Sequence, residues 1–318
     1  TGGEANVAIG YCASKAGTGA RHNVAIGFRA LDSSNTCGNV AIGYQAAYNQ
    51  SSGKCNVLIG CRVMYNAAGG CEVVAVGHKA GYSNNADFNT AIGSCALYSN
   101  TTGTGNLAVG HCSLFASVTS NNNVAVGDQA IRNNTTGCSN VALGTGALQV
   151  NTEGNHNFAV GTETLKCNTC GDYNIGIGTE AVRSNTTGCN NVGVGVNAMY
   201  CNTIGDSNVA IGPSSLYSNI TGGCQTAIGN GALYNSNCTG FNTAVGYQTL
   251  YDQITGTSST ALGFRALYEV NAVGNTAVGH DSQRNTTFGT YNDSFGRSAL
   301  FTNTIGHNNV AMLSLIHI

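Results

Sequence analysis

Residues 89–105 read Asn-Thr-Ala-Ile-Gly-Ser-Cys-Ala-Leu-Tyr-Ser-Asn-Thr-Thr-Gly-Thr-Gly, and close copies of this unit fill the 318-residue chain. The fifth residue of each copy is a glycine, and successive glycines lie 17 residues apart, except for three steps of 16. A short fixed period over a whole chain is typical of a solenoid, in which every repeat forms one coil that contacts only its neighbours. These glycines stand at residues 10, 27, 43, 60, 77, 93, 110, 127, 144, 161, 178, 195, 212, 229, 246, 263, 279 and 296.

The length of the unit and its β-branched residues predict an all-β fold. Helical repeats need roughly 33 residues or more, so a 17-residue coil favours strands. Position two of the unit is mostly valine or threonine and position four is always a large apolar residue, a composition that favours a strand. We therefore predict a parallel β-solenoid, or β-roll, of about 19 coils with two short strands per coil, forming one continuous array over residues 1–312.

Alternation along the first strand predicts two faces, one with positions two and four and the other with positions one, three and five. Because position four is large and apolar in every copy, we expect it to fill the core. The leucine common at position nine, in the second predicted strand, should also be buried. The predicted core ladder is Ile9, Ile26, Ile42, Ile59, Val76, Ile92, Val109, Val126, Leu143, Val160, Ile177, Val194, Ile211, Ile228, Val245, Leu262 and Val278.

Position one is asparagine in most copies, and position ten is often tyrosine or phenylalanine. Stacked coils place like residues about 4.8 Å apart, so we expect an asparagine ladder with amides bonded along the axis and a stack of aromatic rings. The predicted asparagine ladder is Asn6, Asn23, Asn39, Asn56, Asn89, Asn106, Asn123, Asn140, Asn157, Asn174, Asn191 and Asn208.

Charge and hydropathy exclude two classes of partner. The formal net charge is −2 and only 8% of residues are charged, without the basic stripe of a nucleic-acid-binding protein. No apolar run approaches the roughly 20 residues of a membrane-spanning helix. We expect no nucleic-acid partner and no membrane span in this segment.

The sequence offers no clear catalytic, cofactor or metal site. Residues 193–198 and 103–108 resemble a dinucleotide-binding fingerprint, but no helix follows either glycine-rich stretch. Histidines are scattered and carboxylates are few, which argues against metal ligation and paired acid–base chemistry. We expect no cofactor, no metal and no enzymatic activity.

Cys95 and Cys112, two of the 14 cysteines, both occupy position seven of successive coils, while Cys37 with Cys55, Cys55 with Cys71 and Cys170 with Cys189 are further pairs near one another in adjacent turns. The expected Cα separation of Cys95 and Cys112, about 4.8 Å, lies within the range of a disulfide. A disulfide here would indicate an oxidising, extracellular setting. The alternative is that cysteine is simply a small residue tolerated in a ladder.

Asn-x-Ser/Thr acceptors for N-glycosylation occur at nine asparagines, and eight of these lie in the predicted turn, where a glycan would be exposed. The alternative is that the repeated Asn-Thr-Thr turn creates such motifs automatically. The candidate glycosylation sites are Asn100, Asn134, Asn185 and Asn219.

The pentapeptide Asn-Val-Ala-Ile-Gly, as at residues 6–10, 23–27, 39–43 and 208–212, resembles the head repeats of YadA-like trimeric autotransporter adhesins. It is also similar to repeats in tail-fibre-like proteins of phages and giant viruses. The resemblance implies a left-handed β-roll that assembles as a homotrimer, projects from a cell or virion surface and binds a host or matrix. The period here is longer than in those adhesins, because the Asn-Thr-Thr-Gly turn extends each coil.

The leading hypothesis is a non-enzymatic, extracellular fibre segment, a surface adhesin or viral shaft that presents repeated turns for multivalent attachment. Its expected partners are a host-surface glycan or protein receptor and further copies of itself. The small residues at positions one, three and five would allow three chains to approach closely. The alternatives are an ice-binding solenoid, suggested by threonine rows such as residues 101–102, and a tailspike-type glycan-cleaving enzyme, for which we find no clustered carboxylates.

Residues 313–318 leave the repeat and match, in one reading frame, the translation of a sequencing-library adaptor. We expect this hexapeptide to be an assembly scar at the end of a fragment of a longer protein. A hydrophobic end cap is the alternative.

Overall fold

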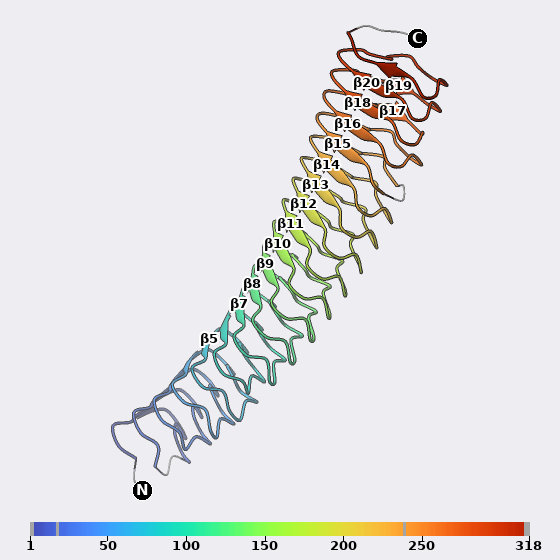
Figure 1. Ribbon diagram of the computed structural model, residues 1–318. Coiled ribbons are helices and arrows are strands. Elements are labelled where there is room, and N and C mark those ends of the chain that lie inside the picture. The colour runs from blue at the N-terminus through green and yellow to red at the C-terminus, as the bar shows by residue number, and fades with distance from the viewer. Residues whose placement is uncertain (1–2, 17–18, 238–239, 315–318) are drawn as a thin grey trace. The chain divides into compact units, whose positions relative to one another are not determined.

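The computed structural model describes residues 3–16, 19–237 and 240–314. It divides into two compact units, residues 1–157 (unit 1) and 158–318 (unit 2). In the described ranges there is no helix, and within each unit short strands stack in parallel with the chain winding once between them (Figure 1). The predicted all-β parallel solenoid with a 17-residue repeat is confirmed. Residues 315–318 of the predicted terminal scar lie outside the described residues.

In unit 1, each strand pairs in parallel with the strand of the next coil, and like positions face one another. Ala91 is the register partner of Ala108, for example, and Ala108 that of Ala125. The strands of unit 1 are β1 (Val7–Ile9), β2 (Val24–Ile26), β3 (Val40–Ile42), β4 (Val57–Ile59), β5 (Val74–Val76), β6 (Thr90–Ile92), β7 (Leu107–Val109), β8 (Val124–Val126) and β9 (Val141–Leu143).

Unit 2 repeats this arrangement, with Ile175 facing Val192 and Val192 facing Val209. Its main sheet contains β10 (Phe158–Val160), β11 (Ile175–Ile177), β12 (Val192–Val194), β13 (Val209–Ile211), β14 (Thr226–Ile228), β15 (Thr243–Val245), β16 (Thr260–Leu262), β18 (Thr276–Val278), β20 (Asp293–Phe295) and β21 (Val310–Ala311). The two-residue strands β17 (Glu269–Val270) and β19 (Asn285–Thr286) pair separately.

The three 16-residue steps do not disturb the register. Val24 pairs with Val40, Val74 with Thr90 and Thr260 with Thr276, as in the full-length coils. The missing residue is therefore absorbed between one strand and the next, where connecting segments tolerate deletion.

The second predicted strand is wrong for most coils. In the described residues it occurs only as the β17–β19 pair. Elsewhere positions seven and nine adopt the left-handed region, as in Cys95 (φ 55°) and Leu97 (φ 51°), where an extended strand cannot continue. The leucine of position nine is nevertheless buried as expected, because this backbone turns its side chain inward: Leu97, Leu148 and Leu233 are fully buried.

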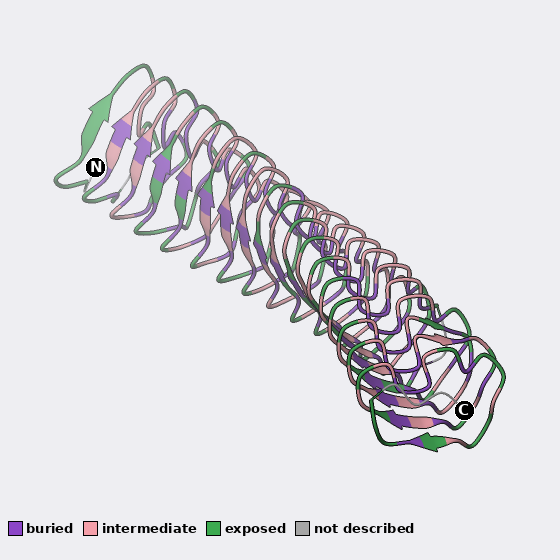
Figure 2. Ribbon diagram, turned by 90° about the horizontal axis from the view of Figure 1, so that it is seen from above, coloured by how far each residue is buried: buried purple, intermediate pink, exposed green. Residues whose placement is uncertain are grey.

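The two faces of the main strand are the reverse of our expectation. The middle residue, alanine at position three, is buried in nearly every strand, while its neighbours are half-buried or exposed (Figure 2). None of the described position-four residues of the predicted core ladder is buried. The prediction for that ladder is wrong for Ile9, Ile26, Ile42, Ile59, Val76, Ile92, Val109, Val126, Leu143, Val160, Ile177, Val194, Ile211, Ile228, Val245, Leu262 and Val278.

The narrowness of a 17-residue coil explains this reversal. Its interior already holds asparagine from position one, leucine from position nine and a second row of small residues at position eight, such as Ala96 and Ala147. Interiors are close-packed, so the residue on the inner face of the strand is usually as small as alanine, although Leu58 of β4 is also fully buried there. The larger valine and isoleucine side chains must therefore point outward.

The fifth-position glycine is required by close approach between coils. Gly93 has φ +136°, and a Cβ added to it would lie 2.5 Å from the carbonyl oxygen of Gly110. A side chain at this position would force the coils apart. The expectation of one continuous array over residues 1–312 stays a prediction.

Candidate functional site

The outward side chains of positions two and four form an apolar surface in each unit, which we call the outer sheet face. It is made of valine, isoleucine, leucine and threonine rows at the spacing of the strands. Ile177 and Ile211 keep 39% and 40% of their surface exposed, and Leu262 keeps 47%. Contiguous apolar patches of this kind are unusual on monomeric proteins and mark interaction sites. These residues are evident in the sequence, but our prediction places those of position four in the core and not on the surface.

The predicted asparagine ladder is buried and hydrogen-bonded along the stack, except for the exposed Asn6 in the first coil. The side-chain oxygen of Asn123 accepts from the backbone N–H of Asn140 at 2.9 Å. Its Nδ2 donates to the carbonyl oxygen of Gly137 at 3.0 Å. Each asparagine thus satisfies one backbone group of the next strand and one of the next turn.

A second asparagine ladder, at position twelve, was missed by the sequence reasoning. Asn185 is fully buried, and its Nδ2 donates to the side-chain oxygen of Asn168 and to the carbonyl oxygen of Gly188, both at 2.8 Å. A glycan cannot be attached to an amide nitrogen in this position without unfolding the turn. The glycosylation prediction is therefore wrong for Asn100, Asn134, Asn185 and Asn219, which are all fully buried with Nδ2 bound inside the coil.

The aromatic residues of position ten stack as expected. In unit 2, the Tyr217 and Tyr234 ring centroids lie 5.0 Å apart with planes 5° from parallel, and Tyr200, Tyr251 and Tyr268 extend the row. A second row in unit 1 runs from Tyr48 through Tyr65, Tyr82 and Tyr98 to Phe115.

Arginine side chains close both rows. The guanidinium of Arg183 lies 5.6 Å from the Tyr200 centroid, and that of Arg284 lies 5.6 Å from Tyr268 at the other end. In unit 1, Arg29 covers Tyr48 at 4.6 Å and Arg132 covers Phe115 at 5.8 Å. A cation over an aromatic face is favourable, so each terminal ring is stabilised where the stack ends. The ring faces are therefore covered and only ring edges remain for a partner.

Threonines occur in two settings with different chemistry. The turn hydroxyls of Thr135, Thr169 and Thr186 donate to carbonyl oxygens of the following coil at 2.9–3.0 Å. On the outer sheet face, by contrast, Thr226 and Thr243 are register partners in a row that Thr260 and Thr276 continue.

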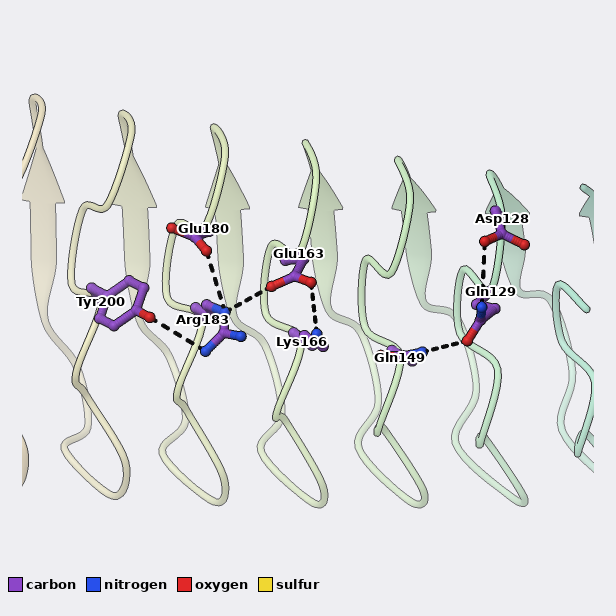
Figure 3. A network of polar contacts seen from close by, with 8 residues as sticks. All are labelled: Asp128, Gln129, Gln149, Glu163, Lys166, Glu180, Arg183 and Tyr200. Carbon is purple, nitrogen blue, oxygen red and sulfur yellow. Dashed lines mark hydrogen bonds and ion pairs between the residues drawn. The ribbon is translucent and has the colours of Figure 1, made fainter.

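Glu163 and Glu180 are two carboxylates that both contact Arg183 in unit 2 (Figure 3). Lys166 donates to Glu163 at 2.7 Å and Arg183 donates to its other oxygen at 2.9 Å. The hydrogen bond from Lys166, with that from Arg183, lowers the pKa of Glu163. A glycosidase general acid needs a raised pKa, so this network does not supply one.

A cysteine–histidine–aspartate cluster lies in unit 1. His111 Nε2 is 3.3 Å from Cys112 Sγ, and His111 Nδ1 is 2.9 Å from Asp128 Oδ1. Cys95 and Cys112 are both free thiols in the structure and lie close together, and burial followed by the neighbouring Cys95 raises the pKa of Cys112. Sequence reasoning missed the cluster, although a signal was present: His111 and Asp128 both occupy position six of successive coils.

Among residues 3–16, 19–237 and 240–314 no group of three or more histidine, cysteine, aspartate or glutamate side chains is arranged to hold a metal ion. Over the same residues, no helix has the length and hydropathy to cross a bilayer. Comparison of the chain with protein-family models, curated proteins and solved structures finds no match.

Proposed function

We propose that this chain is a structural segment of an extracellular surface fibre, in which the outer sheet faces of several copies pack against one another. The observation that supports it is the outward position of the aliphatic rows. Many coils carry two such apolar side chains, for example Val209 and Ile211 in β13, which remain half-buried or exposed in the single chain. Covering them would remove apolar surface from water at every coil.

A further copy of the same chain is the occupant that fits this surface best. The rows repeat at the strand spacing of about 4.8 Å, so a partner must carry apolar groups at that same repeat to fill them along their length. Another copy of the chain has this spacing because its strands repeat at the same distance. Charged side chains are also sparse, at 8% of the sequence, so little repulsion opposes association.

We take the homotrimer from the resemblance to YadA-like adhesin heads and viral tail-fibre repeats. We expected positions one, three and five to form the interface between chains. Because positions one and three are buried inside the coil, the proposed interface is the outer sheet face of positions two and four. Attachment to a host-surface glycan or protein receptor, and a location on a cell or virion surface, follow from the same resemblance. The exposed turns would present one copy of each contact per coil, which favours multivalent binding.

The proposal is tested by the mass of the assembled particle. We expect the purified chain to have the mass of three copies by sedimentation equilibrium. The double variant Ile177→Glu/Ile211→Glu should have the mass of one copy with an unchanged circular dichroism spectrum. The matched control is Ile204→Glu/Ile220→Glu, at exposed turn isoleucines (53% and 42%), which should remain assembled. A monomeric parent chain, or dissociation by the turn variant alone, contradicts the proposal.

Ice binding is the second candidate, and a threonine row on the outer sheet face supports it better than the turn threonines that first suggested it. No hydrogen bond within the described protein involves the hydroxyls of Thr226, Thr243, Thr260 and Thr276, which form a regular row beside the methyl groups of position four. Regularly spaced hydroxyl and methyl groups on an exposed face can order water. This function would use the outer sheet face, so it excludes assembly at these coils. Thermal hysteresis that Thr243→Val/Thr260→Val abolishes would support it, and absence of hysteresis in the dissociated Ile177→Glu/Ile211→Glu chain would reject it.

A further inference from the structure

The cluster of Cys95, Cys112, His111 and Asp128, here called the thiol cluster, is independent of the outer sheet face. Its two cysteines occupy the same position of successive coils and share one backbone conformation, with φ 55° and 52°. The backbone N–H of Cys112 donates to the carbonyl oxygen of Ser94 at 3.0 Å, which fixes the two segments side by side. Their Cα atoms are therefore separated by about one strand spacing, within the range that a disulfide spans.

The imidazole of His111 is placed to take a proton from Cys112. Asp128 Oδ1 accepts a hydrogen bond from Nδ1 at 2.9 Å, which in the neutral imidazole leaves Nε2 as an acceptor facing Cys112 Sγ at 3.3 Å. A nucleophile, a base within reach and a third group that orients the base are the recurring parts of an activated thiol. The His111 and Asp128 side chains are 61% and 46% exposed, so small molecules in solution can reach the cluster.

We propose that the thiol cluster is a redox-active dithiol that reacts with low-molecular-weight disulfides. Cys112 is the attacking thiol, His111 is its base, Asp128 is the positioning residue and Cys95 is the resolving thiol. Nucleophilic thiolate is required for exchange, and a base at hydrogen-bond distance supplies it where the thiol would otherwise stay protonated.

The reaction proceeds in two balanced steps. Cys112 transfers its proton to His111 and attacks one sulfur of the small disulfide RSSR, so that a Cys112–S–S–R bond forms and the R–S–S–R bond breaks. The released RS⁻ takes the proton from His111 and leaves as RSH. Cys95 then loses its proton and attacks the Cys112 sulfur, so that the Cys95–Cys112 disulfide forms and the Cys112–S–S–R bond breaks. The released RS⁻ takes up that proton and leaves as the second RSH. The two cysteines are oxidised and one RSSR is reduced to two RSH.

Cys138 provides a comparison within unit 1. Its Sγ donates to the carbonyl oxygen of Thr136 at 3.3 Å and accepts from the backbone N–H of Asn121 at 3.3 Å. It has a backbone partner where Cys112 has an imidazole. We expect it to react more slowly with the same disulfide.

The chain allows a direct test, because trypsin releases residues 80–132 as one peptide that contains Cys95, Cys112 and no other cysteine. The reduced protein is incubated with glutathione disulfide, quenched with an alkylating reagent, digested and analysed by mass spectrometry. We expect this peptide to lose two hydrogens and its two alkylation sites before Cys138 reacts. Cys95→Ser should instead accumulate glutathione on Cys112.

His111→Gln separates the role of the base from simple proximity. Since general-base assistance contributes roughly 100-fold or more, we expect the rate of disulfide formation to fall at least about tenfold. Cys138→Ser should leave the rate unchanged. The proposal is overturned if residues 80–132 stay fully alkylated while Cys138 is modified, or if His111→Gln reacts at the parent rate.

Discussion

The side-chain oxygen of Asn106 accepts a hydrogen bond from the backbone N–H of Asn123 at 3.0 Å, and Asn123 repeats this contact with Asn140 at 2.9 Å. Replacing Asn123 by alanine leaves the buried N–H of Asn140 without a partner, whereas the carbonyl of Gly137 keeps the Nδ2 of Asn134 at 2.7 Å. A buried unsatisfied group costs about 1–3 kcal/mol, so we expect Asn123→Ala to lower the free energy of unfolding by about 1–3 kcal/mol. Urea denaturation measures the loss.

Asn133→Ala is the matched control for this ladder. Asn133 is half-buried in the same coil, and only its backbone has a hydrogen bond within the described protein, donated to the carbonyl of Gln149. We expect a change within about 0.5 kcal/mol. Equal losses for Asn123→Ala and Asn133→Ala would show that the ladder contributes nothing specific.

Adjacent residues of β13 should respond in opposite ways to a change of size. Ala210 is fully buried, so Ala210→Ile overpacks the coil and should destabilise the single chain by about 1–3 kcal/mol. Ile211 is 40% exposed, so Ile211→Ala should cost less than about 1 kcal/mol in a dissociated background. We compare the thermal unfolding of both variants in the Ile177→Glu background, after sedimentation equilibrium has shown that this single variant has the mass of one copy. A larger loss of stability for Ile211→Ala than for Ala210→Ile would show that position four lies in the core.

Gly93→Ala tests the close approach of successive coils. The new Cβ meets the backbone of Gly110 and the residue must keep φ near +136°, so we expect a loss of about 2–4 kcal/mol. Gly69→Ala is the control, since its Cβ would approach nothing closer than 3.4 Å. Comparable urea midpoints for the two variants would contradict this account of the repeated glycine.

The tyrosine row of unit 2 predicts a loss of stability at alkaline pH. Burial raises the pKa of Tyr217 and of Tyr251, and the phenol of Tyr234 raises both further. A tyrosine in the unfolded chain ionises near about pH 10, so stability is intact below that pH and falls as pH rises toward the higher folded pKa values. Tyr234→Phe should move the alkaline unfolding midpoint to higher pH, as followed by circular dichroism and phenolate absorbance. A midpoint that stays or moves to lower pH would argue against coupling within the row.

Periodicity made the solenoid, the asparagine ladder and the stacked tyrosines predictable, because each depends only on like residues lying above one another. The orientation of the strand was not predictable in the same way. Alternation separates Ala210 from Ile211 but does not say which of them faces inward. The choice depends on the space left by Leu216 and the asparagines, which is a property of the closed coil.

Two other errors have local causes. Asn185 belongs to a turn motif, and turns are normally exposed, but its amide is bound inside by Gly188. Leu97 looks like a strand residue because nothing in the sequence marks a non-glycine position as left-handed. The thiol cluster was within reach, since comparing His111 with the residue one period later finds Asp128.

The strand register is the same across the three 16-residue steps as across the 17-residue steps. This has a consequence for how the length of such a chain evolves. Each coil presents the same contacts to its neighbours. Duplication or loss of an entire coil by unequal recombination therefore joins two coils that already fit each other. The length of the solenoid then varies in whole coils, and a lineage can lengthen or shorten it without passing through an unfoldable intermediate.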